Sequence, residues 1–354
     1  MKKILVFLLA IFSFTLIGCS NESKIINTIY HDTTTSNEEA VNSAYDKAAN
    51  SSCYLTSTLQ TESTSMFGHG HVTTKTTEFS GVLVKKEGSK NYILSYYHLG
   101  NLNNSVSVKT NESSYTGTIV GLDSSNLLSL VLVDDSSFDL TAAVLEEDDL
   151  VKGSDTIVVS QISEGSPMNY LNKGFLSYYN EYLVSTDAPT NYLSLGAGIF
   201  NLEGKLIGLI SQEETDDTSS SYQGICYAIR SIHLDTITSQ MIEEGELNRP
   251  LMGITVSWYS NDLMDDYGYN YPLPDDDCHE VVVDITSGKN GDLAGIKLGD
   301  VIMSVNGVVL SSKNQLTAIM RTSIAGDSIV LGIKRYNSTT KSFADISITV
   351  TLNA

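Results

Sequence analysis

Short segments that fit β-strands recur along most of this chain. Between residues 52 and 229, runs of alternating or β-branched residues are separated by turns of Gly, Asn, Asp and Ser. Short runs with such turns are typical of an all-β barrel or sandwich. The runs are Ser52–Leu59, Val82–Lys85, Ser105–Lys109, Thr118–Leu122, Leu127–Val133, Asp155–Gln161, Lys205–Ser211 and Gly224–Ile229.

A change of pattern after residue 230 predicts a domain boundary. Residues 232–244 repeat apolar side chains with helical spacing, and Gly245 is a plausible end of that helix. Arg249 and Pro250 mark the boundary, after which strands return. We expect a short helix over 313–321 and strands over 328–334 and 344–352. With 354 residues, of which 41% are hydrophobic, the chain is long enough for about two domains.

The N-terminus has the features of an export signal. A basic start is followed by an apolar run from Ile4 to Ile17, too short for a typical membrane span, and then by Gly18 and Cys19. The last four residues of this segment resemble a bacterial lipobox. The resemblance implies that residues 1–18 are a lipoprotein signal peptide, that Cys19 is lipidated, and that the protein is exported and anchored to the bacterial cell membrane, on its extracytoplasmic side. Residues 19–37 are predicted to be a flexible tether.

The charge balance excludes one class of partner. The chain carries 21 Lys and Arg against 42 Asp and Glu, a formal charge of −21. Nucleic-acid binding needs clustered positive charge, so no nucleic acid is expected, and anionic lipid should repel the folded body. The lipid on Cys19 is therefore the predicted membrane contact.

No cofactor and no metal site are predicted. Beyond Cys19, the cysteines are Cys53, Cys226 and Cys278, an odd number that leaves at least one free thiol. His69 and His71 form one possible pair of metal ligands without a third. An acidic segment, Asp275–Asp277 with His279 and Glu280, lacks the spacing of a calcium loop. It ends a segment, residues 259–279, that is rich in Tyr, Asp and Pro and suits either a protein interface or packing on its own domain.

Three motifs stand out in the C-terminal part of the chain. They are Arg249-Pro250-Leu251-Met252-Gly253-Ile254, Leu293-Ala294-Gly295-Ile296-Lys297-Leu298-Gly299-Asp300-Val301-Ile302 and Val305-Asn306-Gly307. Through these motifs, residues 250–354 resemble a PDZ domain of the kind that follows the protease domain in HtrA/DegP-type proteins. The resemblance implies that a peptide or protein C-terminus binds here. The backbone of Met252, Gly253 and Ile254 would hold the carboxylate, and Leu316 and Ile319 would line a pocket for the last side chain. Two alternatives to peptide capture are that the groove binds another segment of this chain, or that it is vestigial.

Three earlier segments, residues 92–98, 121–131 and 186–198, carry a second resemblance. Through them, residues 38–246 resemble the trypsin-like protease domain of the same family. The resemblance places His98 at the position of the general base, Leu127 at that of the orienting aspartate and Leu195 at that of the nucleophile. Leucine can neither attack a carbonyl nor accept a proton. These residues therefore predict a catalytically degenerate protease, not an enzyme. The expected fold is mainly β, a trypsin-like double β-barrel followed by a PDZ domain, which is a β-sandwich with one or two short helices.

The predicted function is a surface-anchored, proteolytically inactive lipoprotein that binds peptides or protein C-termini as a scaffold, sensor or adaptor. One alternative is an active serine endopeptidase of protein quality control, in which a one-residue shift brings Ser194 to His98, with Asn126 in place of the aspartate. The alternation of side chains along an extended segment opposes such a shift. A second alternative is a non-catalytic chaperone, for which the resemblance implies a homotrimer.

Overall fold

The structure is a computed structural model that describes residues 37–64, 70–160, 170–215, 221–258, 280–310 and 315–353. The predicted signal peptide, Cys19 and most of the tether lie outside these residues. Residues 37–49 are helical and lead into the first strand. Within the described ranges, no helix has both the length and the apolar character needed to span a bilayer.

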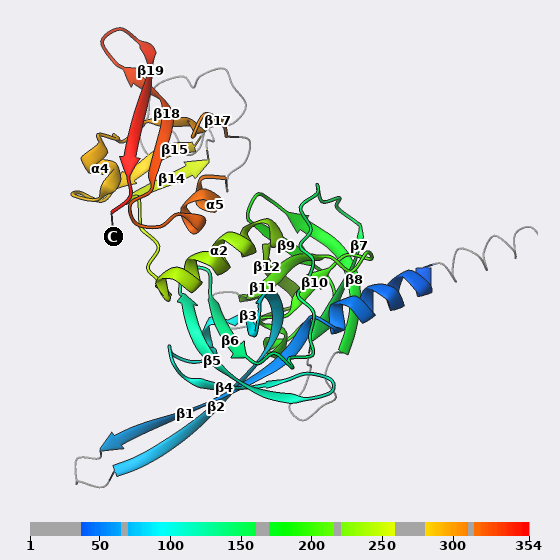
Figure 1. The fold of residues 1–354 in the computed structure, drawn as a ribbon. Coiled ribbons are helices and arrows are strands. Elements are labelled where there is room, and N and C mark those ends of the chain that lie inside the picture. The colour runs from blue at the N-terminus through cyan, green and yellow to red at the C-terminus, as the bar shows by residue number, and fades with distance from the viewer. Residues whose placement is uncertain are drawn as a thin grey trace, which may run out of the picture.

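The first barrel is formed by antiparallel strands. It closes because β5 pairs with both β4 and β6, and β13 adds to β5 in parallel (Figure 1). Its strands are β1 (Ser52–Thr64), β2 (Gly70–Glu87), β3 (Lys90–Tyr96), β4 (Ser105–Lys109), β5 (Ser114–Asp123), β6 (Leu128–Asp134) and β13 (Glu246–Leu247), with a 3-10 turn η1 (Tyr97–Leu99) after β3.

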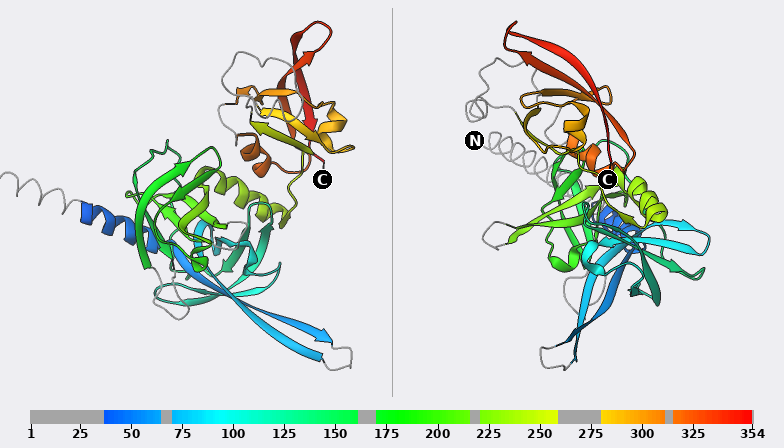
Figure 2. Two further views of the ribbon diagram at one scale, coloured as in Figure 1. Left: turned by 180° about the vertical axis from the view of Figure 1, so that it is seen from behind. Right: turned by 90° about the vertical axis from the view of Figure 1, so that its left-hand side faces the viewer.

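The hairpin of β1 and β2 projects from this barrel in every view (Figures 1 and 2). The sequence predicted strands only over 52–59 and 82–85, but the two strands pair without interruption from Ser52 opposite Val82 to Thr64 opposite Gly70. The projecting stretch is rich in Thr and has no apolar alternation. Its strands are defined by pairing with each other, which leaves little periodic signal in the sequence.

The second barrel is closed in the order β10-β11-β12-β9-β8-β7. Its elements are β7 (Asp155–Ser160), β8 (Tyr170–Tyr179), β9 (Leu183–Thr186), a 3-10 turn η2 (Tyr192–Ser194), β10 (Gly198–Phe200), β11 (Leu206–Thr215) and β12 (Ser221–Arg230). The helix α2 (Ser231–Glu244) follows directly and confirms the helix predicted over 232–244.

A third sheet with two short helices forms the C-terminal part. The strand order is β14-β15-β16-β18-β19, so β14 is an edge strand. The elements are β14 (Ile254–Trp258), β15 (Glu280–Ile285), α4 (Asn290–Ala294), β16 (Val301–Val305), β17 (Val308–Val309), α5 (Gln315–Thr322), β18 (Ser328–Asn337) and β19 (Ser342–Thr351). The mainly β architecture that the sequence predicts is confirmed. The exact domain boundaries stay a prediction.

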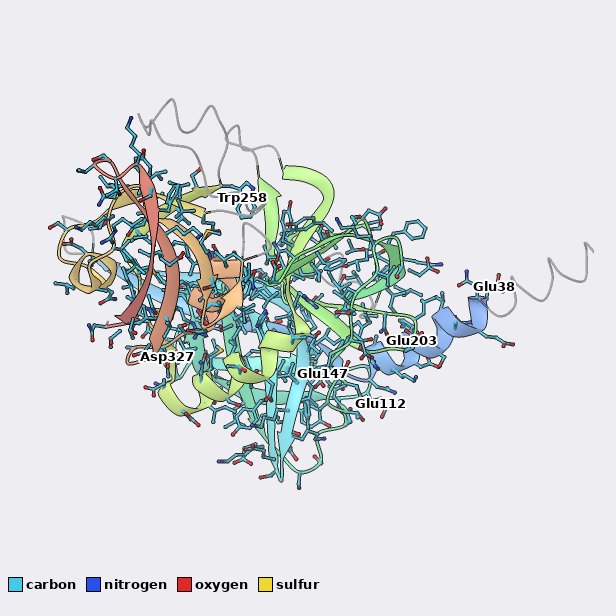
Figure 3. The ribbon with its side chains drawn as sticks, turned by 90° about the horizontal axis from the view of Figure 1, so that it is seen from above. Glu38, Glu112, Glu147, Glu203, Trp258 and Asp327 are labelled. Atoms are coloured by element: carbon cyan, nitrogen blue, oxygen red, sulfur yellow. The ribbon has the colours of Figure 1, made fainter. Side chains whose placement is uncertain are left out.

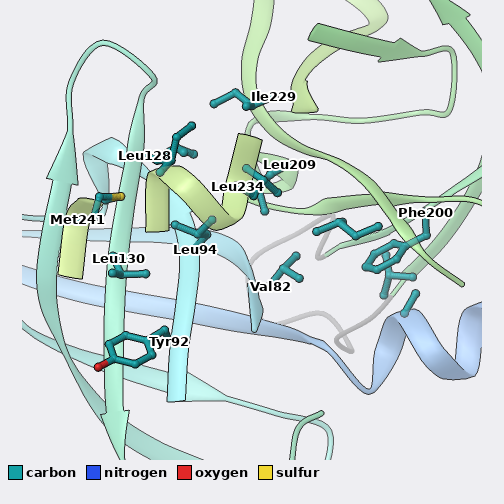
Figure 4. Packing of buried hydrophobic residues seen from close by; sticks show 14 of the residues in the cluster. Val82, Tyr92, Leu94, Leu128, Leu130, Phe200, Leu209, Ile229, Leu234 and Met241 are labelled. Carbon is teal, nitrogen blue, oxygen red and sulfur yellow. The ribbon is translucent and has the colours of Figure 1, made fainter. Parts of the chain in front are cut away.

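One apolar cluster joins the two barrels through α2. Leu234, Ile237 and Met241 recur at helical spacing, are fully buried, and pack with Leu94, Leu128, Phe200 and Leu209 of both barrels (Figure 4). The helix ends at Gly245, whose φ of 75° few other residues adopt and whose N–H donates to Met241 O at 3.1 Å. Charged side chains such as Glu112, Glu147, Glu203 and Asp327 lie on the exterior (Figure 3).

A buried ion pair connects the third sheet to the first barrel. The Arg249 guanidinium donates to Asp123 Oδ2 from Nη2 at 2.7 Å and from Nε at 3.1 Å, and both side chains are almost fully buried. Arg249 Nη1 also donates to Gln240 Oε1 of α2 at 2.6 Å and to Ser323 O, just after α5, at 3.1 Å. The linker residue thus binds three separate elements.

Removing this guanidinium should destabilise the protein strongly. We expect Arg249→Met to lower the free energy of unfolding by about 3–5 kcal/mol, because it leaves the Asp123 carboxylate buried without its partner. Urea unfolding followed by far-UV circular dichroism measures this loss. Lys334→Met is the matched control, because its partner Asp345 is 83% exposed and such pairs contribute less than about 1 kcal/mol. Equal losses in the two variants would contradict the prediction.

Candidate functional site

His98 lies on the first barrel and contacts Tyr96, which packs against an apolar cluster of the second barrel. It is exposed on the short turn η1, whose next residue, Leu99, is fully buried and anchors the turn. The imidazole makes edge contacts with the rings of Tyr96 and Tyr97, with 5.4 Å between ring centroids in each case. These contacts hold the ring between two tyrosines and leave one side open to solvent.

Leu127 lies beside His98 on the turn that joins β5 and β6. Its carbonyl accepts a hydrogen bond from Tyr97 N–H at 2.9 Å, so the turn is tied to the residue before His98. The φ of Leu127 is 55°, a left-handed conformation that costs about 1–2 kcal/mol for a residue with a Cβ. Asp123 compensates for this strain, because its Oδ1 accepts from Asn126 N–H at 3.1 Å and closes the turn.

Leu195 comes from the second barrel and packs into its core. It is 8% exposed and belongs to an apolar cluster that Phe79 and Tyr96 of the first barrel also contact. Its carbonyl accepts from Ser80 N–H at 3.1 Å, and Leu193 O accepts from the Ser80 hydroxyl at 2.8 Å. The segment predicted to carry the nucleophile is therefore bound along β2, close to the tyrosines that contact His98.

Ser194, the candidate for a shifted site, is fully buried. Its hydroxyl hydrogen-bonds with Ser160 Oγ at 3.1 Å and accepts from Asn191 N–H at 3.3 Å. Gly196 fixes the turn, because a Cβ there would lie 2.2 Å from Ser80 O. Among the described residues, no hydrogen bond joins Ser194 to His98.

Asn126, the third residue of that alternative, belongs to a different network. Its Nδ2 donates to Asp123 Oδ2 at 2.7 Å and to Arg321 O at 2.9 Å, while the Tyr182 hydroxyl donates to its Oδ1. Burial raises the pKa of Tyr182, so the phenol stays protonated and keeps this bond. Sequence reasoning missed Tyr182 and Arg249 as members of this network, since residues so far apart in the chain leave no local pattern.

A groove lies between the edge strand β14 and the helix α5. Its cavity of about 410 Å³ is lined by Met252, Gly253, Ile254 and Leu316, four of the residues predicted to bind peptide. The fifth, Ile319, instead packs against the core of the third sheet, and Thr317 and Met320 line the groove from α5. Gly253 has a φ of 75°, and a Cβ there would lie 2.3 Å from the Lys289 side chain. The loop therefore needs glycine at this position.

Comparisons with known proteins agree with this arrangement. A model of the trypsin-like peptidase domain matches residues 79–209. The serine protease Do-like HtrA of Lactococcus lactis subsp. cremoris is 25% identical over 342 residues, covering 88% of this chain and 84% of that protein. The periplasmic pH-dependent serine endoprotease DegQ of Escherichia coli is 27% identical over 264 residues, covering 72% of this chain and 56% of DegQ. Over most of its length the chain is therefore similar to HtrA/DegP-like serine proteases of the trypsin fold.

Solved structures agree on the fold. The HtrA-type protease AlgW with decapeptide aligns with a TM-score of 0.66 at 19% identity, covering 89% of this HtrA-like chain and 99% of AlgW. The serine endoprotease from Yersinia pestis aligns with a TM-score of 0.57 at 20% identity, and the alignment covers 88% of this chain and 97% of that protein. The predicted trypsin-like double barrel followed by a further β domain is therefore confirmed.

The prediction that this HtrA-like chain is not an enzyme is wrong. Its matched relatives, including HtrA, DegQ and DegP, are named serine proteases or endoproteases, so the family points to an enzyme. The prediction rested on Leu127 and Leu195 alone. The physical argument excludes those two side chains from acid–base or nucleophilic roles, but it does not decide which other groups act.

The candidate metal ligands are only partly described. His69, Asp275–Asp277 and His279 lie outside the described residues, as does Cys278, and His71 is described only as part of β2. Within the described ranges, no group of three or more His, Cys, Asp and Glu could hold a metal ion. Cys53 and Cys226 are buried, and burial raises the pKa of the Cys53 thiol, which keeps that thiol unreactive.

Glu280, the last residue of the acidic segment, is a buried carboxyl at the start of β15. It is 2% exposed, and its Oε2 has no hydrogen-bond partner among the residues that the structure describes. Burial raises its pKa to about 7 from an ordinary value of 4.5. The folded state therefore favours the neutral acid.

This shift should appear in the pH dependence of stability. Neutral Glu280 contributes up to about 3 kcal/mol to the free energy of unfolding. This contribution is fully present below about pH 4.5 and is lost as the pH rises through about 7. We expect Glu280→Gln to remove this part of the decline when urea unfolding is measured between pH 4 and 8. The exposed Asp345→Asn variant should keep the wild-type slope. An unchanged slope in Glu280→Gln would refute the assignment.

Proposed function

We propose that this chain is an HtrA-type serine endopeptidase that captures peptide or protein C-termini in the groove between β14 and α5. The observation that carries the proposal is the groove itself, built onto a double barrel whose matched relatives are named endoproteases. A captured chain end would keep an unfolded substrate close to the barrels. The groove of the third sheet would then bind the substrate, and the two barrels would cleave it.

The backbone of the groove suits an extended peptide. The outer edge of β14 is unpaired within the described sheet, so a peptide can add there as a further strand. The backbone hydrogen bonds found outside helices and strands in the described residues include none donated by Met252 or Gly253. Their N–H groups are available to an anion such as a terminal carboxylate. Leu316 and Met320 supply an apolar wall for the last side chain.

The hydrolytic step is assigned to His98 and Ser194. His98 is an exposed imidazole on the first barrel and would accept the proton of the attacking hydroxyl. Substrate binding would have to replace the hydrogen bond between Ser194 and Ser160 and turn the hydroxyl toward His98. Asn126 is occupied by Asp123, Tyr182 and Arg321, so the contacts with Tyr96 and Tyr97 would orient the imidazole.

We also propose an extracytoplasmic location. DegQ and DegP, two of the relatives, are named periplasmic proteins. The basic and apolar N-terminus ending at Cys19 supports export and a lipid anchor. A net charge of −21 would hold the folded body away from anionic lipid and leave the groove accessible.

The first test of this proposal is hydrolysis of an unfolded protein. We expect the purified chain to cleave reduced, unfolded casein, and Ser194→Ala and His98→Ala to lose on the order of 1,000-fold or more of that activity. Ser177→Ala is the matched control, because Ser177 is an exposed serine of the same barrel. Release of soluble fragments measures the rate.

The two failures of this test have different meanings. No cleavage by the unmodified chain, under any condition that leaves casein unfolded and the protease folded, would overturn the endopeptidase assignment. Cleavage that survives in both variants would keep the activity but exclude Ser194 and His98 as its catalytic residues.

The second test concerns peptide capture. We expect the full chain to bind hexapeptides that end in an apolar residue at least ten times more tightly as free acids than as C-terminal amides, because only the acid presents a carboxylate to the loop. Fluorescence anisotropy of N-terminally labelled peptides measures both affinities. Equal binding of acids and amides would show that the groove does not recognise chain ends.

A further inference from the structure

The groove is lined by a residue of the first barrel as well as by the loop before β14 and by α5. Ser125, on the β5–β6 turn of the first barrel, lines the groove beside Pro250 and Leu251 of the loop and Arg321 of α5. The Arg321 guanidinium donates from Nη1 to Ser125 O, and its carbon lies 5.9 Å from the centre of the Tyr182 ring. Ser125 of the first barrel and Tyr182 of the second barrel together fix the direction of this side chain.

Arg321 is a cation without a carboxylate partner in the described part of the chain. No Asp or Glu oxygen there lies within 4.0 Å of its nitrogens, whereas the neighbouring Arg249 is bound to Asp123. Arg321 is half-buried and lines both the groove and a smaller cavity of about 90 Å³ behind it. In a chain of charge −21, an unpaired guanidinium in a groove is a local site for an anion.

The end of α5 would repel an anion if its carbonyls were left free, because a helix C-terminus carries partial negative charge. Side chains from outside α5 donate to these carbonyls. Asn126 binds Arg321 O at 2.9 Å, Gln240 binds Thr322 O at 2.9 Å and Arg249 binds Ser323 O at 3.1 Å. The contacts with the barrel and α2 thus remove the feature that would oppose a carboxylate at this end.

We propose that Arg321 pairs with the terminal carboxylate of a peptide in the groove, and that the barrel residues Ser125 and Asn126 hold it in position to do so. The inference rests on the proposed peptide capture and adds the charged residue that selects a free chain end. The loop residues Met252 and Gly253 and the side chain of Arg321 line the same cavity, so both could donate to one carboxylate. Charge-assisted hydrogen bonds of this kind are about twice as strong as neutral ones.

The experiment compares acids and amides in charge variants of the full chain. The probes are labelled hexapeptides ending in Ala, Val, Leu, Met or Phe, each made as free acid and as amide. We expect Arg321→Gln to weaken binding of the acids about tenfold or more and to leave binding of the amides unchanged. Arg321→Lys should keep part of the preference for acids. Lys297→Gln removes the same charge from an exposed loop residue that does not line the groove, and should behave as wild type.

The outcomes separate this inference from the proposed function. If wild type prefers acids and Arg321→Gln keeps that preference, peptide capture stands and the role of Arg321 is overturned. If Arg321→Gln weakens acids and amides equally, Arg321 only supports the fold of the groove, which also overturns it. If no peptide binds wild type in either form, both the groove function and this inference fail. A thermal unfolding curve for each variant confirms that it is folded.

Discussion

The arrangement of the domains depends on one buried charge, the Arg249 guanidinium. It lies in the linker between β13 and β14 and makes hydrogen bonds to Asp123, Gln240 and Ser323 O. A buried charge is very costly unless it is paired and its hydrogen bonds are satisfied. The first barrel, α2 and the end of α5 must therefore all contact the Arg249 side chain. This requirement fixes the groove relative to the barrels.

The same network reaches the residues beside His98. Asp123 accepts from Arg249 on one side and holds the turn containing Asn126 and Leu127 on the other. The carbonyl of Leu127 in turn binds the N–H of Tyr97, next to His98. A displacement of α5 would thus break the hydrogen bond between Asn126 and Arg321 O. Because Leu127 of the same turn binds Tyr97, the change would extend to the residue next to His98. The structure offers a continuous path between the groove and the candidate catalytic imidazole.

Local patterns in the sequence predicted the local structure well. The spacing of Leu234, Ile237 and Met241 predicted α2, and the apolar–Gly–apolar loop at 252–254 predicted one wall of the groove. Contacts between distant residues could not be predicted in this way. The sequence marks Arg249 as a boundary and as the start of the loop motif, but it does not indicate the ion pair with Asp123, which lies 126 positions away. The extended hairpin is not predicted because its outer part is rich in Thr and has no apolar alternation, and its strands are defined by pairing with each other.

The error about enzymatic activity has a related physical origin. Triad chemistry needs a hydroxyl, a base and correct geometry, and the substitutions at Leu127 and Leu195 remove two side chains from fixed positions in that geometry. They do not remove the barrel interface, the exposed His98 or the neighbouring Ser194 hydroxyl. In the described turn that hydroxyl makes two neutral hydrogen bonds, with Ser160 Oγ and with Asn191 N–H, each worth about 1 kcal/mol in net terms. The larger obstacle is the backbone of the turn, which Ser80 and Gly196 hold against β2, so any catalytic conformation must include movement of that segment.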